Sequence, residues 1–352
     1  MSASRASAAL DGSGSTAGAW GRNEEAFSRL VEPQLTELHA HCYRMLGSLH
    51  DAEDALQDTL LRAWRGMRRF DHERPARPWL YRIATNVCLN AIAQRSRRAR
   101  TIHNGLATPT EVDEPDEAHD DLRWFEPYPD ERLGIEGGLS SPEARYERRE
   151  ALEIAFVSAL QQLSGRQRAV LILRDVLGFS AKEVADTLDT TPVSVNSALQ
   201  RARNAVAERL PEQSQQATMR SLGDRRINRL VRRFVDAFER GDANAIVALL
   251  ADDAKLAMPP ETRSYRGRKA IAASWLMPEP GTHSLRYVLT HANGQLAFGA
   301  YRLHQDAGAY VPIALDVLAI RGDYITEIIA FRTPDVFDRL GLPAALPMVA
   351  RT

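Results

Sequence analysis

The side chains best suited to chemistry on a nucleic acid lie close together between positions 74 and 82. Trp79 and Tyr81 offer flat aromatic faces, and Arg74, Arg77 and Arg82 offer positive charge. Opening a duplex requires a surface on which an unstacked base can rest and a cationic grip on the strand. These residue types therefore suit binding to an unpaired nucleic-acid strand. The competing interpretation is that both aromatic rings only pack on a neighbouring helix.

A second polar group lies in the last third of the chain and comprises Asp252, Asp253, Tyr265, His291, Tyr301 and Asp316. An acid and a tyrosine in an apolar pocket can move protons. None of the six is assigned to a catalytic step, and Asp252 and Asp253 fit a turn after a helix. His39 and His41 do not share a helix face. We expect no catalytic residue, no metal site, no cofactor and no enzymatic activity.

Two helices on either side of Pro75 and Pro78 must position these side chains, because proline cannot continue a helix. The first helix is expected to start with Asp51 as N-cap. Apolar residues at helical spacing predict one buried stripe on each helix. The stripe of the first helix is Leu56, Leu60, Ala63, Trp64 and Met67. The stripe of the second helix is Leu80, Ile83, Ala84, Val87 and Ala91. The outer face and basic end of the second helix add Thr85, Asn86, Arg97 and Arg98 to the predicted DNA contacts.

A second helical unit follows one continuous helix expected over residues 142–163. Two capping boxes, Ser164 with Gln167 and Ser180 with Glu183, each start a helix. A third helix starts at Thr191 as N-cap, and its buried stripe is Val195, Leu199, Ala202 and Val206. This order predicts a helix-turn-helix with its last helix in the major groove. The residues predicted to contact DNA there are Thr191, Ser194, Val195, Asn196, Ser197, Gln200, Arg201 and Arg203.

The last third changes from helical to strand periodicity. A helical stripe over 227–238 and a short helix over 241–250 precede four alternating segments, at 283–291, 295–304, 310–321 and 324–331. Asn293-Gly294 and Gly322-Asp323 have the composition of hairpin turns. The pattern predicts an α+β domain after all-α units.

Composition sets the outer bounds. The chain has 352 residues and a net charge of -1, which suggests two or three domains and a locally rather than globally basic surface. Cys42 and Cys88 are the two cysteines, which favours a reducing cytoplasm and buried thiols rather than disulfides. No apolar run is long enough for a bilayer, so no membrane partner is expected.

Proline, glycine and carboxylate content separate the units. The expected division is a flexible tail (1–22), a helical unit (23–100), an acidic linker (101–142), the helix-turn-helix (143–210), a glutamine-rich linker (211–224), the α+β domain (225–340) and a tail (341–352).

Several motifs carry a family resemblance. "DAEDALQDTLLRAWR" followed by "RPWLYRIATNVCLNAIAQRSRRA" resembles region 2 of sigma-70 factors of the extracytoplasmic-function (ECF) branch, and "LSGRQRAVLILRDVLGFSAKEVADTLDTTPVSVNSALQRAR" resembles region 4. "WFEPYPDERL" resembles a motif of ECF proteins that carry an extra C-terminal domain. "VRRFVDAFERGDANAIVALLADDAKLAMPP" and "YRGRKAIAASW" resemble SnoaL-like domains of the cone-shaped α+β barrel fold.

The resemblance implies binding to core RNA polymerase and promoter DNA. Region 2 is expected to dock on the β′ clamp through Asp54, Gln57, Asp58, Leu61 and Arg62. Its second helix is expected to read and help melt the −10 element, so the resemblance makes the aromatic and arginine side chains between positions 74 and 82 the expected strand-opening residues. Region 4 is expected to bind the β flap and the −35 element. The SnoaL-like domain is expected to regulate the sigma regions by intramolecular contact. Whether this domain also binds a small ligand is left open. The alternatives are a helix-turn-helix regulator acting without polymerase, and a bifunctional protein with a ligand-binding or cyclase/isomerase-like domain.

Overall fold

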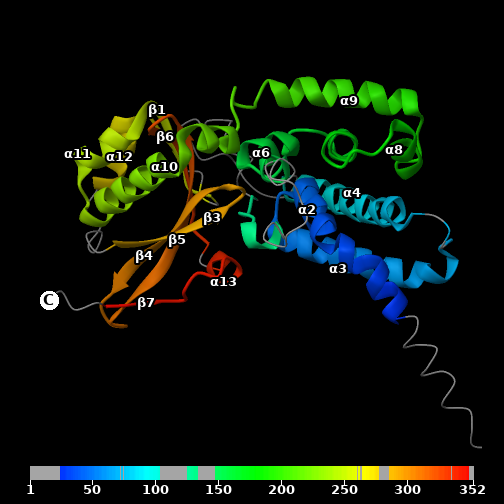
Figure 1. Ribbon diagram of the computed structural model, residues 1–352, viewed down its shortest axis with the longest axis horizontal. Coiled ribbons are helices and arrows are strands. Elements are labelled where there is room, and N and C mark those ends of the chain that lie inside the picture. Colours follow the sequence, from blue (N-terminus) through cyan, green and yellow to red (C-terminus); the bar gives the residue numbers. More distant parts are fainter. Residues whose placement is uncertain are drawn as a thin grey trace, which may run out of the picture.

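Figure 1 shows the computed structural model as a helical half joined side by side to an α+β domain. The structure describes residues 24–71, 73, 75–103, 125–133, 147–259, 261, 264–276, 285–333 and 335–348, without the side chains of 98–103, 133 and 274–276. The predicted tail at 1–22 and most of the acidic linker lie outside these residues. The fold class, all-α units followed by an α+β domain, is confirmed.

Three helices make the first unit. They are α2 (Leu35–Leu46), α3 (Leu49–Gly66) and α4 (Ala76–His103), preceded by a helix over 24–31 and the short η1 (Glu32–Gln34), with η2 (Met67–Arg69) after α3. The N-cap of α3 is Ser48, whose side chain accepts from the Asp51 amide, so the prediction of Asp51 as N-cap is wrong. Asp51 instead pairs with Arg95 of α4. Cys42 and Cys88 are free and buried, as predicted.

The second unit contains α6 (Ile154–Gln161), α7 (Gly165–Leu171), the π-helix η5 (Ile172–Val176), α8 (Ala181–Thr187) and α9 (Pro192–Ala207). Both capping boxes and the Thr191 N-cap are confirmed. The single helix predicted over 142–163 is wrong, because the chain leaves helical geometry at Glu153. The Glu153 carboxylate accepts from the amides of Gln215 and Gln216 at 3.0 and 2.8 Å, and burial raises its pKa to about 7.

The α+β domain begins with α10 (Gln215–Arg240) and α11 (Ala243–Leu249). Its sheet has the order β2-β1-β6-β5-β4-β3, antiparallel except for β1 with β6, and β7 pairs with β5. The remaining bounds are β1 (Leu250–Ala257), β2 (Ser264–Arg266), α12 (Arg268–Leu276), β3 (Leu285–Ala292), β4 (Gln295–His304), β5 (Ala309–Arg321), β6 (Tyr324–Phe331), α13 (Val336–Arg339) and β7 (Leu346–Pro347). The four predicted strands are confirmed, whereas β1, β2 and β7 were not predicted.

Parts of both predicted linkers are packed structure. Residues 125–133, which include η4 (Asp130–Leu133), bury Phe125 and Tyr128. Residues 215–222 form the first turns of α10, which breaks at Gly223, where φ is +69°. The predicted tail likewise buries Leu342 and supplies β7. Composition misled the prediction because a few apolar or amide side chains suffice to anchor a short segment on an existing core.

The hydrophobic core is shared between the two halves. One apolar cluster runs through both helical units and reaches the outer face of the sheet at Val317, Ile329 and Phe331. A second cluster fills the space between α10 and the sheet, where Phe234 stacks on Phe298 at 4.4 Å. The helical units and the α+β domain therefore form one packed body.

Candidate nucleic-acid interface

The predicted strand-opening residues meet the second helical unit. Arg77 donates to the carbonyl of Leu177 at 2.7 Å and its guanidinium lies 4.4 Å from the ring centre of Phe179. Tyr81 is buried edge-on against the same ring at 5.3 Å. Arg82 pairs with Asp189 at 3.0 Å on the surface. All three side chains are occupied by contacts that a nucleic acid would need to replace.

The other predicted contacts of α4 differ in exposure. Trp79 is half-buried and stacks on Phe70 at 4.5 Å, and Asn86 is also half-buried. Thr85 is fully buried and its hydroxyl lies 3.0 Å from Nε2 of His41, so its predicted place on the outer face is wrong. Burial lowers the pKa of His41 to about 3, which keeps the ring neutral. Arg97 is exposed, whereas Arg74 and the Arg98 side chain lie outside the described residues.

The outer face of α9 presents most of the residues predicted for the major groove. Its exposed members are Thr191, Ser194, Asn196, Ser197, Gln200, Arg201 and Arg203. Val195 is buried in the core, so its inclusion among the DNA contacts is wrong. Arg203 is held by Asp175 through two hydrogen bonds of 2.7 Å, which raise its pKa.

Sequence reasoning missed Val193 on this face. Its side chain is 76% exposed, although it stands between Pro192 and the core residue Val195. An apolar side chain at the start of a recognition helix can contact a thymine methyl group. Helical spacing in the sequence could have predicted this exposure, because Val193 is two positions before the core residue Val195 and so faces away from the core.

The residues predicted to bind the polymerase clamp share one uncovered face of α3. Asp54, Gln57, Asp58, Leu61 and Arg62 are all exposed, with Leu61 at 53%. Asp58 and Arg62 lie 3.5 Å apart along the helix. An exposed leucine flanked by carboxylates and an amide suits a protein partner better than a nucleic acid.

The β3–β4 turn of the α+β domain is inserted into the junction of the helical units. Asn293 is 0% exposed. Its Nδ2 donates to Tyr43 Oη and to the Leu152 carbonyl, and its Oδ1 accepts from the Tyr128 amide, all at 2.8 Å. The next residues extend the junction, since the Gly294 amide donates to Asp130 and the Gln295 side chain accepts from the Ile154 amide. We call Asn293, Gly294 and Gln295 the junction turn.

Residues 125–133 are clamped between the first unit and the sheet. Tyr128 Oη lies 2.8 Å from Nδ1 of His39, and burial lowers the pKa of His39 to about 4. Glu126 accepts from Ser48 Oγ and from the His50 amide. Phe125 stacks on Phe331 of β6 at 6.0 Å. The predicted intramolecular contact between the C-terminal domain and the helical units is thus present.

The polar residues of the last third do not form one site. Asp252 and Asp253 belong to strand β1 rather than to a turn, are exposed, and pair with Arg268 and Arg321. Asp316 is buried in β5, and the hydroxyl of buried Tyr301 donates to the Pro343 carbonyl. Within the described ranges, no group of three or more His, Cys, Asp or Glu side chains is placed to hold a metal ion. No described helix is both long and apolar enough to cross a bilayer.

Comparison with known proteins agrees with this arrangement. Residues 30–98 match the model for Sigma-70 region 2, residues 153–206 the model for Sigma-70, region 4, and residues 231–328 the model for a SnoaL-like domain. The chain is 39% identical over 324 residues to ECF RNA polymerase sigma factor SigG of Mycobacterium tuberculosis (strain H37Rv), covering 91% of this chain and 85% of SigG.

Two further relatives are more distant. ECF RNA polymerase sigma factor SigW of Bacillus subtilis is 38% identical over 73 residues, 21% of this chain and 39% of SigW. The crystal structure of the extracytoplasmic function sigma factor SigJ of Mycobacterium tuberculosis shares the fold, with a TM-score of 0.57 and 22% identity over 91% of this chain and 99% of SigJ. Given its identity to SigG along most of both sequences, the chain belongs to the family of ECF RNA polymerase sigma factors, with a SnoaL-like domain at its C-terminal side.

Proposed function

We propose that this sigma factor docks on core RNA polymerase through α3, reads the −35 element with α9, and melts the −10 element with α4. We propose further that the structure is a closed form, in which region 4 covers the strand-opening residues of region 2. The observation that carries the proposal is the occupation of Arg77, Tyr81 and Arg82 by Leu177, Phe179 and Asp189. DNA melting then requires the two regions to separate.

The SnoaL-like domain restrains region 2 and region 4 from separating. The junction turn bonds to region 2 through Tyr43 and to the start of region 4 through Leu152 and Ile154. Each buried hydrogen bond of this kind contributes on the order of 1 kcal/mol, and leaving a partner unpaired costs more. The domain therefore favours the closed form and acts as a built-in inhibitor that polymerase binding or another signal relieves.

The exposure of α3 indicates that polymerase docking comes before the separation of regions 2 and 4. Because Asp54, Gln57, Leu61 and their neighbours are uncovered, polymerase can engage the closed form. Separation of the regions follows docking, since the DNA surfaces of α4 are released only then. The functional units we propose are region 2 (23–100), region 4 (143–210) and the regulatory domain (225–340), with residues 125–133 and 211–224 as packed connectors.

We propose no catalytic step for the C-terminal domain. Asp252 and Asp253 are surface residues engaged with arginines, and neither they nor Asp316 line the large cavities at the domain junctions. The features that separate a sigma factor from an independent helix-turn-helix regulator are the region 2 helices and the clamp-binding face of α3.

The closed form is tested by weakening the region 2 to region 4 contact without touching region 2. The double variant Phe179→Leu with Asp189→Asn removes the shared ring and the Arg82 ion pair, and Asn suits the φ of +49° at position 189. We expect fluorescence energy transfer between dyes on the two regions to fall, and run-off transcription with limiting sigma factor to rise several-fold.

The matched control is Tyr324→Leu with Asp306→Asn, which changes an exposed ring and an exposed acid on the α+β domain. Both readouts should stay at the wild-type level in this control. Unchanged energy transfer and unchanged transcription in the interface variant would contradict the closed-form proposal.

A further inference from the structure

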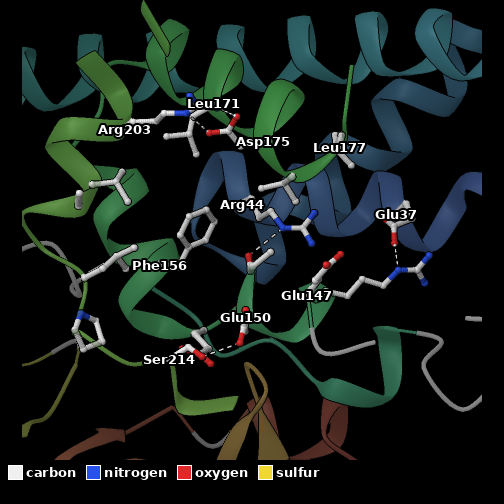
Figure 2. A pocket seen from close by; sticks show the side chains of 18 of the residues that line it. Glu37, Arg44, Glu147, Glu150, Phe156, Leu171, Asp175, Leu177, Arg203 and Ser214 are labelled. Atoms are coloured by element: carbon white, nitrogen blue, oxygen red, sulfur yellow. Dashed lines mark hydrogen bonds and ion pairs between the residues drawn. The ribbon is translucent and has the colours of Figure 1, made fainter. Parts of the chain in front are cut away.

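A cavity of about 790 Å³ lies where region 2, region 4 and the second connector meet. Figure 2 shows Arg44 of α2 pointing into it, with Phe156 and Leu171 of region 4 nearby and Ser214 at the start of α10 below. The volume falls in the range of small-molecule sites, which are roughly 300–1,000 Å³. Each of the three meeting segments contributes part of the wall.

Arg44 is the unusual feature of this cavity. It is 1% exposed, its Nε donates to the Ala151 carbonyl at 3.0 Å, and its Nη1 has no hydrogen-bond partner among the described residues. Desolvation by burial lowers its pKa, with the attraction of Glu37 acting in the opposite direction. A buried cation without a bonded anion is costly, and a carboxylate placed against its guanidinium would relieve that cost.

Four of the five carboxylates in the lining are already engaged with other groups. Glu37 pairs with Arg148 at 3.1 Å, and Asp175 binds Arg203. Glu150 accepts from Ser214 Oγ at 2.7 Å, and Glu153 accepts from two amides of α10. Of the other lining arginines, Arg148 and Arg203 have carboxylate partners, and Arg77 is held by the Leu177 carbonyl and the Phe179 ring. Among the described lining residues, Nη1 of Arg44 is therefore the buried side-chain donor that has no hydrogen-bond partner, and an anionic ligand can bind to it.

The rest of the wall is apolar and limits the charge of the ligand. The apolar side chains that line the cavity from region 4 are Phe156, Leu171, Leu177, Val206 and Leu210. Five carboxylates and four guanidinium groups belong to the lining, so a second negative charge on a ligand would meet repulsion. One anionic group on an apolar body matches this distribution.

We propose that the cavity binds an amphipathic monoanion, a carboxylate on an apolar chain, with the carboxylate against Arg44 and the chain along Phe156, Leu171 and Leu177. Such a ligand touches region 2 and region 4 together, so it binds the closed form and not the open one. Its regulatory effect, which rests on the proposed closed-to-open transition, is to shift the population towards the closed form by mass action.

The test is calorimetric titration of the full chain with sodium octanoate, and with neutral 1-octanol for comparison. Wild-type protein should bind octanoate saturably with one site. Arg44→Met, which keeps an unbranched side chain, should weaken octanoate binding by about tenfold or more, the loss expected for a charge-assisted contact of about 1.4 kcal/mol. Binding of 1-octanol should change little, and Arg232→Met on the exposed face of α10 should bind octanoate as the wild type does.

A second variant covers the case in which Arg44→Met does not fold. Ala207 is an exposed residue at the end of α9 that lines the cavity, so Ala207→Trp should block octanoate without lowering the melting temperature. Absence of saturable octanoate binding to the wild type, or equal affinity in Arg44→Met and wild type, would overturn the site.

Failure of the site and failure of the closed form give different results. Energy transfer between dyes on regions 2 and 4 should rise on adding octanoate, and only in proteins with Arg44. Saturable, Arg44-dependent binding with no change in energy transfer would overturn the regulatory effect alone. If the wild type does not bind octanoate, but the Phe179→Leu and Asp189→Asn variant still shows lower energy transfer than the wild type, the ligand site alone would be overturned.

Discussion

Asp316 is a carboxylic acid enclosed by the sheet of the C-terminal domain. It is 2% exposed, pairs in register with Phe298 and Ala330, and its Oδ2 has no hydrogen-bond partner among the described residues. Burial raises its pKa to about 7, against the weaker attraction of Arg332. Because the folded protein holds this proton more tightly than the unfolded chain, the free energy of unfolding falls as pH rises between about 4 and 7.

Asp316→Asn should therefore stabilise the domain at high pH. Relative to wild type, we expect the free energy of unfolding to gain roughly 3 kcal/mol between pH 5 and pH 8, because each pKa unit corresponds to about 1.4 kcal/mol. Urea unfolding of both proteins at the two pH values measures the difference. Asp306→Asn, at an exposed turn, should show no such gain. A pH-independent difference between Asp316→Asn and wild type would show that residue 316 is not protonated in the fold.

At the scale of elements, α9 carries two arginines that look equivalent in the sequence but differ in their contacts. Arg201 is exposed on the outer face, whereas Arg203 is bound by Asp175 of η5. An arginine that already has a carboxylate partner releases little counterion when it meets phosphate. The contribution of α9 to phosphate binding should therefore come mainly from Arg201.

Arg201→Ala should weaken binding to a −35 promoter fragment and reduce the slope of log affinity against log salt by about 1. Arg203→Ala should change the slope by clearly less. Fluorescence anisotropy at several salt concentrations measures both, with Arg225→Ala in the exposed part of α10 as the control. Equal slopes for Arg201→Ala and wild type would remove Arg201 from the phosphate contacts.

Helix starts and strands were predictable from the sequence where residues a few positions apart determine them. The capping boxes at Ser164 and Ser180 and the strands on both sides of Asn293-Gly294 depend on residues a few positions apart, and they agree with the structure. The break before α6 was missed because the partners of Glu153 are distant: its carboxylate accepts hydrogen bonds from the first two amides of α10, some sixty positions along the chain. The strand β1 was missed for a similar reason, since its pairing with β6 is parallel and long-range.

On the scale of the whole molecule, one turn links three parts of the chain. The sequence identified Asn293-Gly294 as a hairpin turn, which the φ values of +56° and +69° confirm. Its second role, bonding to Tyr43, Tyr128 and Leu152, could not be read locally because those partners come from other units. The same applies to Tyr81, whose type indicated base stacking but whose ring is covered by Phe179 from region 4.

Asn293→Gly separates these two roles, because glycine keeps the turn and removes the amide. We expect the C-terminal domain to loosen from the helical regions, with a loss of about 2–4 kcal/mol from three buried hydrogen bonds and an unpaired Tyr128 amide. Energy transfer between dyes on the domain and on region 2 should fall, and limited proteolysis within residues 125–133 should accelerate. Asp306→Gly, in the exposed β4–β5 turn, is the matched control. Wild-type behaviour in both assays would show that the hydrogen bonds of the Asn293 side chain do not hold the domain to the helical regions.

The Arg82–Asp189 pair has a consequence for cells whose internal ion content changes. Both side chains are at least half exposed, so dissolved salt weakens their attraction, as it weakens the hold of cationic residues on phosphate. A rise in electrolyte would thus remove one of the contacts that cover the melting surface while lowering the affinity of that surface for the promoter. The two effects have opposite signs, and output from this sigma factor should vary less with electrolyte than the grip of either DNA-reading helix taken alone.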